Sequence, residues 1–131
     1  MFDFAKVSIV ADHLALMDGE EFNRSAISRY YYSLFGSVRL FLILVLGETS
    51  FAWGSDVHRR ICDRLKYSDD PTEHSLGKTL DKLRQLRNLS DYDWENTDSE
   101  FFQNRLTFVQ KESQIGLQQV DALKKSPPFN L

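Results

Sequence analysis

Apolar residues recur every three or four positions along most of the chain, which is the spacing of an amphipathic α-helix and not of a strand. This pattern predicts five helical segments, at about residues 4–17, 20–46, 56–66, 72–90 and 102–125. Helix-breaking residues stand between them, with Gly19 and Gly47 after the first two segments and Pro71 before the fourth. We therefore predict an all-α fold, an antiparallel up-and-down bundle of four main helices plus a shorter one.

The apolar positions of each segment fall on one side of its helix, and these sides should form the core. In the first segment they are Phe4, Val7, Leu14 and either Val10 or Ala11. In the second they are Ile27, Tyr31, Leu34, Val38, Phe41 and Val45. In the later segments they are Val57, Ile61 and Leu65, then Leu76, Leu80 and Leu83, and finally Phe102, Leu106, Val109, Leu117 and Val120. The second half of segment 20–46 is apolar on most sides, so we expect it to be buried from several directions.

The composition is that of one ordinary globular domain. Of the 131 residues, 42% are apolar and 27% are charged, which favours a single core over residues 1–125 followed by a short tail, 126–131. Sixteen basic and nineteen acidic side chains give a net charge of -3. Nucleic acid would therefore have to be held by a local patch and not by a general positive field.

Several kinds of site and location do not fit the sequence. The single cysteine, Cys62, has no partner for an internal disulfide and suits a reducing compartment. The longest apolar run, residues 40–46, is far shorter than the roughly 20 residues of a membrane-spanning helix, and the N-terminus does not resemble a secretory signal. Phosphate-binding glycine loops and metal-spaced Cys or His clusters are missing. We expect a cytoplasmic protein without membrane association, metal or cofactor.

The first candidate functional feature is the polar stretch Ser28 to Phe35, which lies inside the apolar segment 20–46. It combines Arg29 with three consecutive tyrosines, residues 30–32. Buried phenols and guanidinium groups need partners, because an unsatisfied polar group in a core costs about 1–3 kcal/mol. Arg29 and Tyr32 fall one helical turn apart and can share a polar face. The tyrosines can equally be core residues with their hydroxyl groups at the rim, and we favour this interpretation for Tyr30.

The second candidate feature is Arg87, near the end of the fourth segment. Continuing the stripe of Leu80 and Leu83 by four positions leads to Arg87, where an apolar residue would be expected. A cation in that position needs an acid close by. Asp91 follows four residues later, which is one turn away if the helix persists that far. The two residues could also be an ordinary stabilising pair at a helix end, and their spacing alone leaves both interpretations open.

Taken together, these two stretches resemble the HEPN domains, and within them a group with a Ser-Arg-x-Tyr-Tyr-x-x-Phe helix and an Arg-x-x-Ala-Asp-Tyr helix end. The first motif is matched by Ser28, Arg29, Tyr31, Tyr32 and Phe35, and the second by Arg87, Asn88, Asp91 and Tyr92, with Ser90 in place of the usual alanine. His58 occupies the position where that group tends to carry a histidine. The last segment is also similar, so the resemblance spans nearly the whole chain.

The resemblance implies a helical bundle that forms a dimer, with the two arginine-bearing helix ends facing each other across a cleft. Many HEPN proteins are metal-independent ribonucleases or the toxin half of a toxin–antitoxin pair, often beside a small nucleotidyltransferase. Catalytic members use an arginine to bind phosphate and a histidine, four to six residues later, as the base that assists attack of the ribose 2′-hydroxyl.

This chain departs from the catalytic pattern, because the expected histidine is missing. Positions four to six after Arg87 hold Asp91, Tyr92 and Asp93, and the corresponding positions after Arg84 hold Asn88, Leu89 and Ser90. His58 could supply the imidazole if its helix packs beside Arg87. A single histidine near a helix start is, however, more often an exposed or capping residue.

Two functions from different classes follow. The first is an RNA-directed HEPN protein of a toxin–antitoxin or defence system, acting on tRNA or mRNA as a homodimer. Its catalytic candidates are Arg87, His58 and Asp91, and its binding candidates are Arg29, Tyr31, Tyr32, Arg84, Asn88 and Tyr92. The second is a non-catalytic module that docks a partner such as a nucleotidyltransferase antitoxin, or that binds RNA or a nucleotide without cleaving it. A helical scaffold with no nucleic-acid role is a third alternative.

Overall fold

The computed structural model describes residues 1–95, 98 and 100–125, and this part of the chain contains five α-helices and no strand. The helices are α1 (Val7–Ala15), α2 (Glu20–Leu40), α3 (Val57–Lys66), α4 (Pro71–Tyr92) and α5 (Leu106–Lys125). A π-helical turn, Phe41–Val45, continues α2, and 3₁₀ turns cover Phe4–Lys6, Thr49–Ala52 and Gln103–Arg105. The all-α prediction with five helical segments is confirmed.

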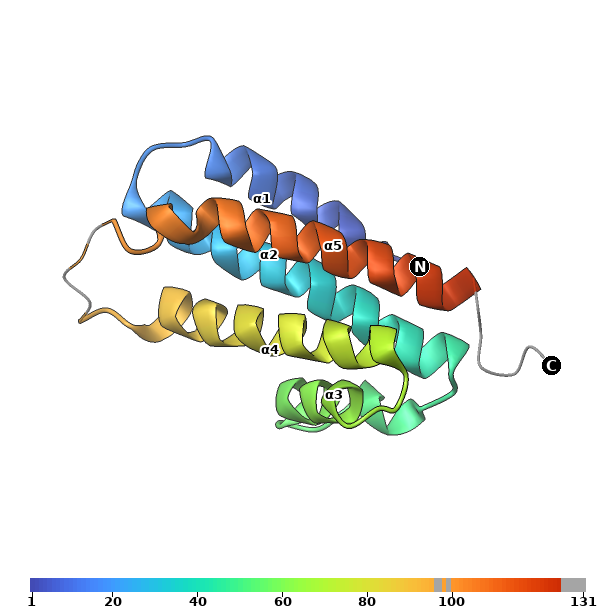
Figure 1. Ribbon diagram of the computed structural model, residues 1–131. Helices are drawn as coiled ribbons and strands as arrows, with labels where there is room; N and C mark the ends of the chain where they lie inside the picture. Colours follow the sequence, from blue (N-terminus) through green and yellow to red (C-terminus); the bar gives the residue numbers. More distant parts are fainter. Residues whose placement is uncertain (96–97, 99, 126–131) are drawn as a thin grey trace.

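Helix α2 is at the centre of the bundle and contacts α1, α4 and α5 (Figure 1). Helices α1 and α4 run opposite to α2, whereas α5 runs in the same direction. The shorter α3 packs beside α4. Because α2 and α4 are antiparallel, the amino-terminal half of α2 lies beside the carboxyl-terminal end of α4. Within the described residues, the helices are all too short or too polar to cross a membrane.

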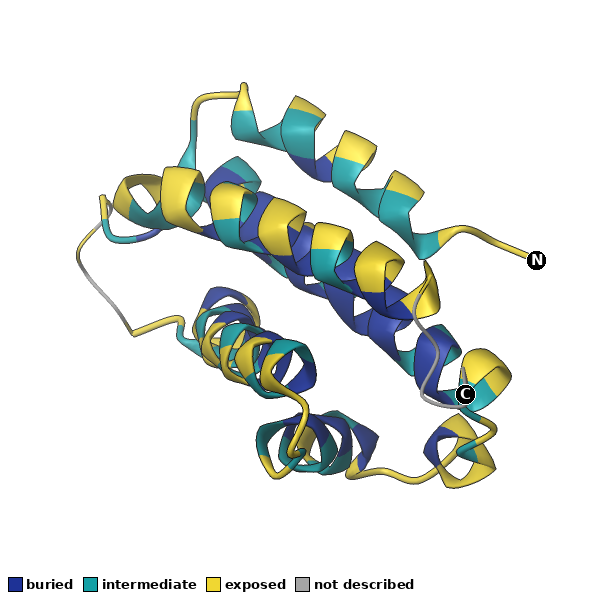
Figure 2. Ribbon diagram, turned by 45° about the vertical axis from the view of Figure 1, so that its right-hand side comes forward, coloured by how far each residue is buried: buried dark blue, intermediate teal, exposed yellow. Residues whose placement is uncertain are grey.

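The apolar stripes predicted from the sequence face one shared core, which Figure 2 shows as the dark inner sides of the helices. Ile27, Tyr31 and Leu34 of α2 are completely inaccessible to solvent, as are Leu80 and Leu83 of α4. Burying one such side chain contributes about 1.5–3 kcal/mol. The ambiguity in the first segment is resolved in favour of Ala11, which is fully buried, whereas Val10 is 51% exposed.

The prediction that Val45 belongs to the buried stripe is wrong. Val45 is 41% exposed and its neighbour Leu44 is 57% exposed. The reason is the π-helical turn, in which the N–H group of Leu46 donates to the carbonyl oxygen of Phe41 at 3.2 Å. The wider turn holds an extra residue and rotates the following side chains away from the stripe. Burial from several directions therefore ends at Leu42.

The boundaries of α4 also differ from the prediction. The helix begins at Pro71, before the expected residues 72 or 73, because Asp70 caps it and proline fits the first turn of a helix. The Asp70 carboxylate accepts a hydrogen bond from the N–H group of Glu73 at 2.9 Å. The helix continues to Tyr92, which puts Asp91 on the same helix as Arg87.

The last segment begins later than its apolar pattern suggests. Phe102 is fully buried, as predicted, but it precedes α5, which starts at Leu106. The predicted end at Pro127-Pro128 and the tail 126–131 lie outside the described residues.

Close packing of α3 against α4 depends on Gly77. A Cβ atom at Gly77 would lie 2.7 Å from the Cβ atom of Leu65, 2.7 Å from the backbone nitrogen of Lys66 and 2.9 Å from the carbonyl carbon of Leu65. Two of these atoms belong to the backbone of α3, which a side-chain rotation cannot move. We expect Gly77→Ala to lower the free energy of unfolding, measured in urea, by about 1–2 kcal/mol, although alanine favours a helix by about 1 kcal/mol.

The matched control is Lys78→Ala on the exposed side of the same helix, which should leave the stability nearly unchanged. Equal unfolding midpoints for Gly77→Ala and the original chain would show that α3 does not pack this closely on α4.

Candidate nucleic-acid interface

The side chain of Arg87 is buried between α2 and α4, although arginine is rarely buried without full pairing. Only 7% of Arg87 is exposed. Its guanidinium carbon lies 5.2 Å from the centre of the Tyr31 ring and 5.3 Å from the centre of the Tyr32 ring. These distances fit cation–π contacts, each contributing about 0.5–2 kcal/mol. The two sequence motifs therefore meet in space, with Arg87 of α4 over the tyrosines of α2.

The polar atoms of Arg87 are poorly satisfied. Its Nε atom is buried and has no hydrogen-bond partner within the described residues. Its Nη1 atom lies 3.6 Å from Oδ2 of Asp91, which is close enough for charge attraction and too far for a good hydrogen bond. Asp91 itself is exposed and also accepts a long hydrogen bond, 3.4 Å, from the hydroxyl group of Ser28. The Arg87 guanidinium thus retains donors without a hydrogen-bond partner in the described residues.

His58, at the start of α3, is held against the same tyrosine pair. The hydroxyl group of Tyr31 and Nδ1 of His58 are 2.6 Å apart. The imidazole ring stacks on Phe35, with ring centres 4.0 Å apart. The histidine is therefore neither freely exposed nor a helix cap. Its helix packs on α4, which also carries Arg87, and this is the arrangement in which His58 could supply an imidazole.

The environment of His58 keeps its imidazole neutral. Burial is the main reason that its pKa falls to about 4, and the positive charges of Arg87, Arg39 and Arg84 lower it further. Burial also raises the pKa of the Tyr31 phenol, so Tyr31 stays protonated near neutral pH. A neutral Tyr31–His58 pair beside a cation is a poor source of the base that RNA cleavage requires.

A groove of about 610 Å³ opens next to Arg87, between the amino-terminal half of α2 and the end of α4. Its walls include the predicted binding residues Arg29, Tyr32 and Tyr92, together with Asp91. Arg29 is exposed and forms no ion pair within the described part of the chain, and Tyr92 is 69% exposed. Two phenol rings and a free guanidinium group thus face the same solvent-filled space.

Arg84 and Asn88 lie apart both from this groove and from the stacked rings under Arg87. Arg84 bonds Asp81 through Nη2 at 2.8 Å, and this hydrogen bond is the main reason that the pKa of Arg84 is raised. It influences the site through its charge, which lowers the pKa of His58 and opposes the rise in the pKa of Tyr31. Asn88 is half-buried and makes no side-chain hydrogen bond within the described residues. The groove walls include neither residue.

The sequence interpretation missed Arg24, which closes one end of the groove. Its guanidinium group donates to the carbonyl oxygens of Ser90 at 3.1 Å and Asp93 at 2.8 Å, and so satisfies the carboxyl-terminal end of α4. It also lies over the Phe102 ring, 4.2 Å from the ring centre. These contacts join residues more than sixty positions apart, and no spacing rule within one helix could have indicated them.

Comparison with protein-family models, curated proteins and solved structures gives no match for this chain. Within residues 1–95, 98 and 100–125, no group of three or more His, Cys, Asp or Glu side chains is arranged to hold a metal ion.

The effect of the Arg87 charge should be measurable as a change in the pKa of His58. Replacing Arg87 by methionine keeps most of the buried volume and removes the cation whose charge lowers the pKa of the imidazole most. We expect the pKa of His58, followed by NMR titration of its ring protons, to be near 4 in the original chain and to rise by about 0.5–1 unit in Arg87→Met. Lys111→Ala, on the exposed side of α5, removes a distant charge and should leave this pKa unchanged. A His58 pKa near 6.5 in the original chain would contradict the described packing.

Proposed function

We propose that this chain is an HEPN-type RNA-binding protein of a toxin–antitoxin or defence system, which acts as a dimer and holds an RNA phosphate at Arg87. The observation that carries the proposal is the buried Arg87 guanidinium, which lies on two tyrosine rings, has a free Nε atom and makes only a loose contact with Asp91. A structural arginine would be expected to have its donors satisfied.

The groove beside Arg87 supports single-stranded RNA as the ligand. Proteins that bind single strands combine basic side chains that follow the backbone with aromatic rings on which bases stack. Arg29 supplies an unpaired guanidinium group at the groove, and Tyr32 and Tyr92 supply rings. Trp94, 82% exposed just after α4, adds another ring near this end of the helix. Stacking on one such ring contributes about 1–3 kcal/mol per base.

In this proposal Asp91 controls access to Arg87, because its carboxylate is part of the groove wall and lies 3.6 Å from Nη1 of Arg87. A phosphate group can reach Arg87 only if this carboxylate turns away, and Asp91 is exposed enough to do so. Removing its charge should therefore strengthen RNA binding. If Asp91 instead acted as the base in RNA cleavage, with Arg87 and His58, removing its charge would abolish cleavage.

Binding without cleavage is the form of the proposal that the chemistry favours. A histidine whose pKa is about 4 accepts a proton poorly at neutral pH, and Tyr31 already occupies its Nδ1 atom. His58 then acts by positioning Tyr31, which in turn forms one of the two ring faces under Arg87.

A docking module for a partner protein, such as a nucleotidyltransferase antitoxin, is the second candidate. The acidic net charge favours it, because an acidic protein attracts RNA poorly. The position of Arg87 behind the groove wall also favours it, because a side chain there suits a structural pair with Asp91. In that case, Arg87→Met should leave binding of the partner intact. Loss of partner binding by a folded Arg87→Met variant would count against the structural role.

RNA binding can be tested by fluorescence anisotropy with a labelled single-stranded oligoribonucleotide and total tRNA as competitor. We expect Arg87→Met and Arg29→Ala each to raise the Kd about tenfold or more, which corresponds to the loss of one charge-assisted contact. Asp91→Asn should lower the Kd several-fold. The charge-matched control is Lys111→Ala, outside the groove, with a change of less than about twofold expected.

Incubating the same variants with the RNA and separating the products on a gel tests cleavage in parallel. The proposal is wrong if the original chain binds no RNA, or if Arg87→Met, Arg29→Ala and Lys111→Ala weaken binding equally, because equal effects would mean non-specific charge attraction.

A further inference from the structure

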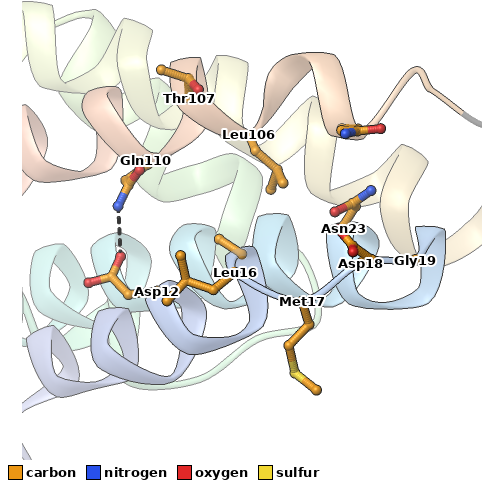
Figure 3. A pocket seen from close by; sticks show the side chains of 11 residues that line it. Asp12, Leu16, Met17, Asp18, Gly19, Asn23, Leu106, Thr107 and Gln110 are labelled. Carbon is orange, nitrogen blue, oxygen red and sulfur yellow. Dashed lines mark hydrogen bonds between the residues drawn. The ribbon is translucent and has the colours of Figure 1, made fainter.

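A second cavity, separate from the groove, lies at the opposite side of α2, where the end of α1, the start of α2 and the beginning of α5 meet (Figure 3). Its volume is about 370 Å³, which is within the range of small-molecule sites. Asp12 and residues 15–19 form one wall, Asn23 lies on α2, and the other wall consists of Gln103, Leu106, Thr107 and Gln110. The RNA-binding proposal assigns no role to any of these residues.

The walls of this cavity carry negative charge without a matching cation. Asp12 and Asp18 both line it, and its lining includes no lysine, arginine or histidine. Neither carboxylate takes part in an ion pair within the part of the chain that the structure describes. The last carbonyl groups of α1, around Ala15 and Leu16, add the negative end of a helix dipole.

Asp12 is held in place with one oxygen free. Its Oδ1 atom accepts hydrogen bonds from the hydroxyl group of Tyr30 and from Nε2 of Gln110, the latter at 3.0 Å (Figure 3). Both donors are neutral and both bind the same oxygen. The Oδ2 atom has no hydrogen-bond partner in the described residues. This carboxylate is therefore positioned by two helices and still has its second oxygen available.

Asn23 provides an independent indication of a ligand. It is only 6% exposed, yet its side-chain amide forms no hydrogen bond within the described residues. Figure 3 shows the amide directed toward the cavity between Leu106 and Asp18. The side-chain amide can accept two hydrogen bonds and donate two, and none of these is used within the described residues. Asn23 thus presents an unpaired polar group at the end of the cavity where Asp18 lies (Figure 3).

We propose that this cavity binds a small organic cation that carries an ammonium or guanidinium group. A ligand with a cationic group at each end places one of them at Oδ2 of Asp12 and the other near Asp18 and the amide oxygen of Asn23, which lie at the opposite end of the cavity (Figure 3). Thr107 and Gln110 offer further acceptors on the α5 side. The apolar side chains of Leu16 and Leu106 contact the aliphatic part of the ligand.

Isothermal titration calorimetry of the full chain with putrescine and agmatine tests this proposal. We expect saturable binding of at least one of them. We expect Asn23→Leu to abolish it while the Tm of the ligand-free chain changes by no more than a few degrees, since the amide makes no hydrogen bond within the described residues that leucine would lose. Asp18→Asn, on an exposed residue whose loss should not affect folding, should weaken binding about tenfold.

Two controls separate a specific site from general attraction of cations. Asp121→Asn removes an exposed acid on α5 outside the cavity and should not change binding. Tetramethylammonium is also a cation but has no N–H donors, and it should not bind. The proposal is overturned if neither putrescine nor agmatine binds, in which case the cavity holds solvent only. It is also overturned if tetramethylammonium binds equally well, if Asp18→Asn binds as the original chain does, or if Asn23→Leu strongly lowers the Tm of the free chain.

Discussion

The contact of one guanidinium group with two tyrosine rings, in the middle of the α2–α4 interface, is the interaction on which the candidate site depends. Moving a cation out of water costs several kcal/mol, and a buried Nε without a partner adds about 1–3 kcal/mol. The two cation–π contacts together stabilise the folded state by about 1–4 kcal/mol. The loose pair with Asp91 adds little stability because Asp91 is exposed. A leucine or methionine in this position would continue the apolar stripe of α4 without any of these costs. The stability of the bundle therefore does not explain Arg87, which is the basis of the proposal that it binds an anionic ligand.

The rest of the site is organised around the same rings. Tyr31 forms one face under Arg87 and, through its hydroxyl group, fixes the imidazole of His58 on α3. Tyr32 forms the other face and continues into the wall of the groove, where Arg29 and Tyr92 are exposed. One tyrosine thus links the arginine to the interior, and the next links it to the surface. Because His58 is kept neutral by burial and by neighbouring arginines, this arrangement is better suited to holding a phosphate group than to moving a proton.

The features of the structure that depend on spacing within one helix could be predicted from the sequence. The apolar stripes gave the five helices and the buried side of each, and the four-residue step from Arg87 to Asp91 indicated their contact. Val45 was misplaced because a π-helical turn changes the period, and the sequence pattern does not reveal such a turn. Contacts between different helices could not be predicted from such spacing. The Tyr31–His58 hydrogen bond depends on how α3 packs, and the contact of Arg24 with the end of α4 depends on the antiparallel register of α2 and α4. Asn88, expected at the cleft, is one position away from Arg87 and faces a different side of α4.

The central claim is that Arg87 contributes little to folding and is retained for an anionic ligand. Equilibrium unfolding of Arg87→Met in urea, compared with the original chain in a buffer without phosphate or RNA, tests this claim most directly. The account predicts a free energy of unfolding within about 1 kcal/mol of the original, or a higher one, because a hydrophobic side chain of similar volume replaces an incompletely paired charge. A loss of about 3–5 kcal/mol, as is typical when a well-satisfied buried ion pair is broken, would contradict it and make Arg87 a structural residue.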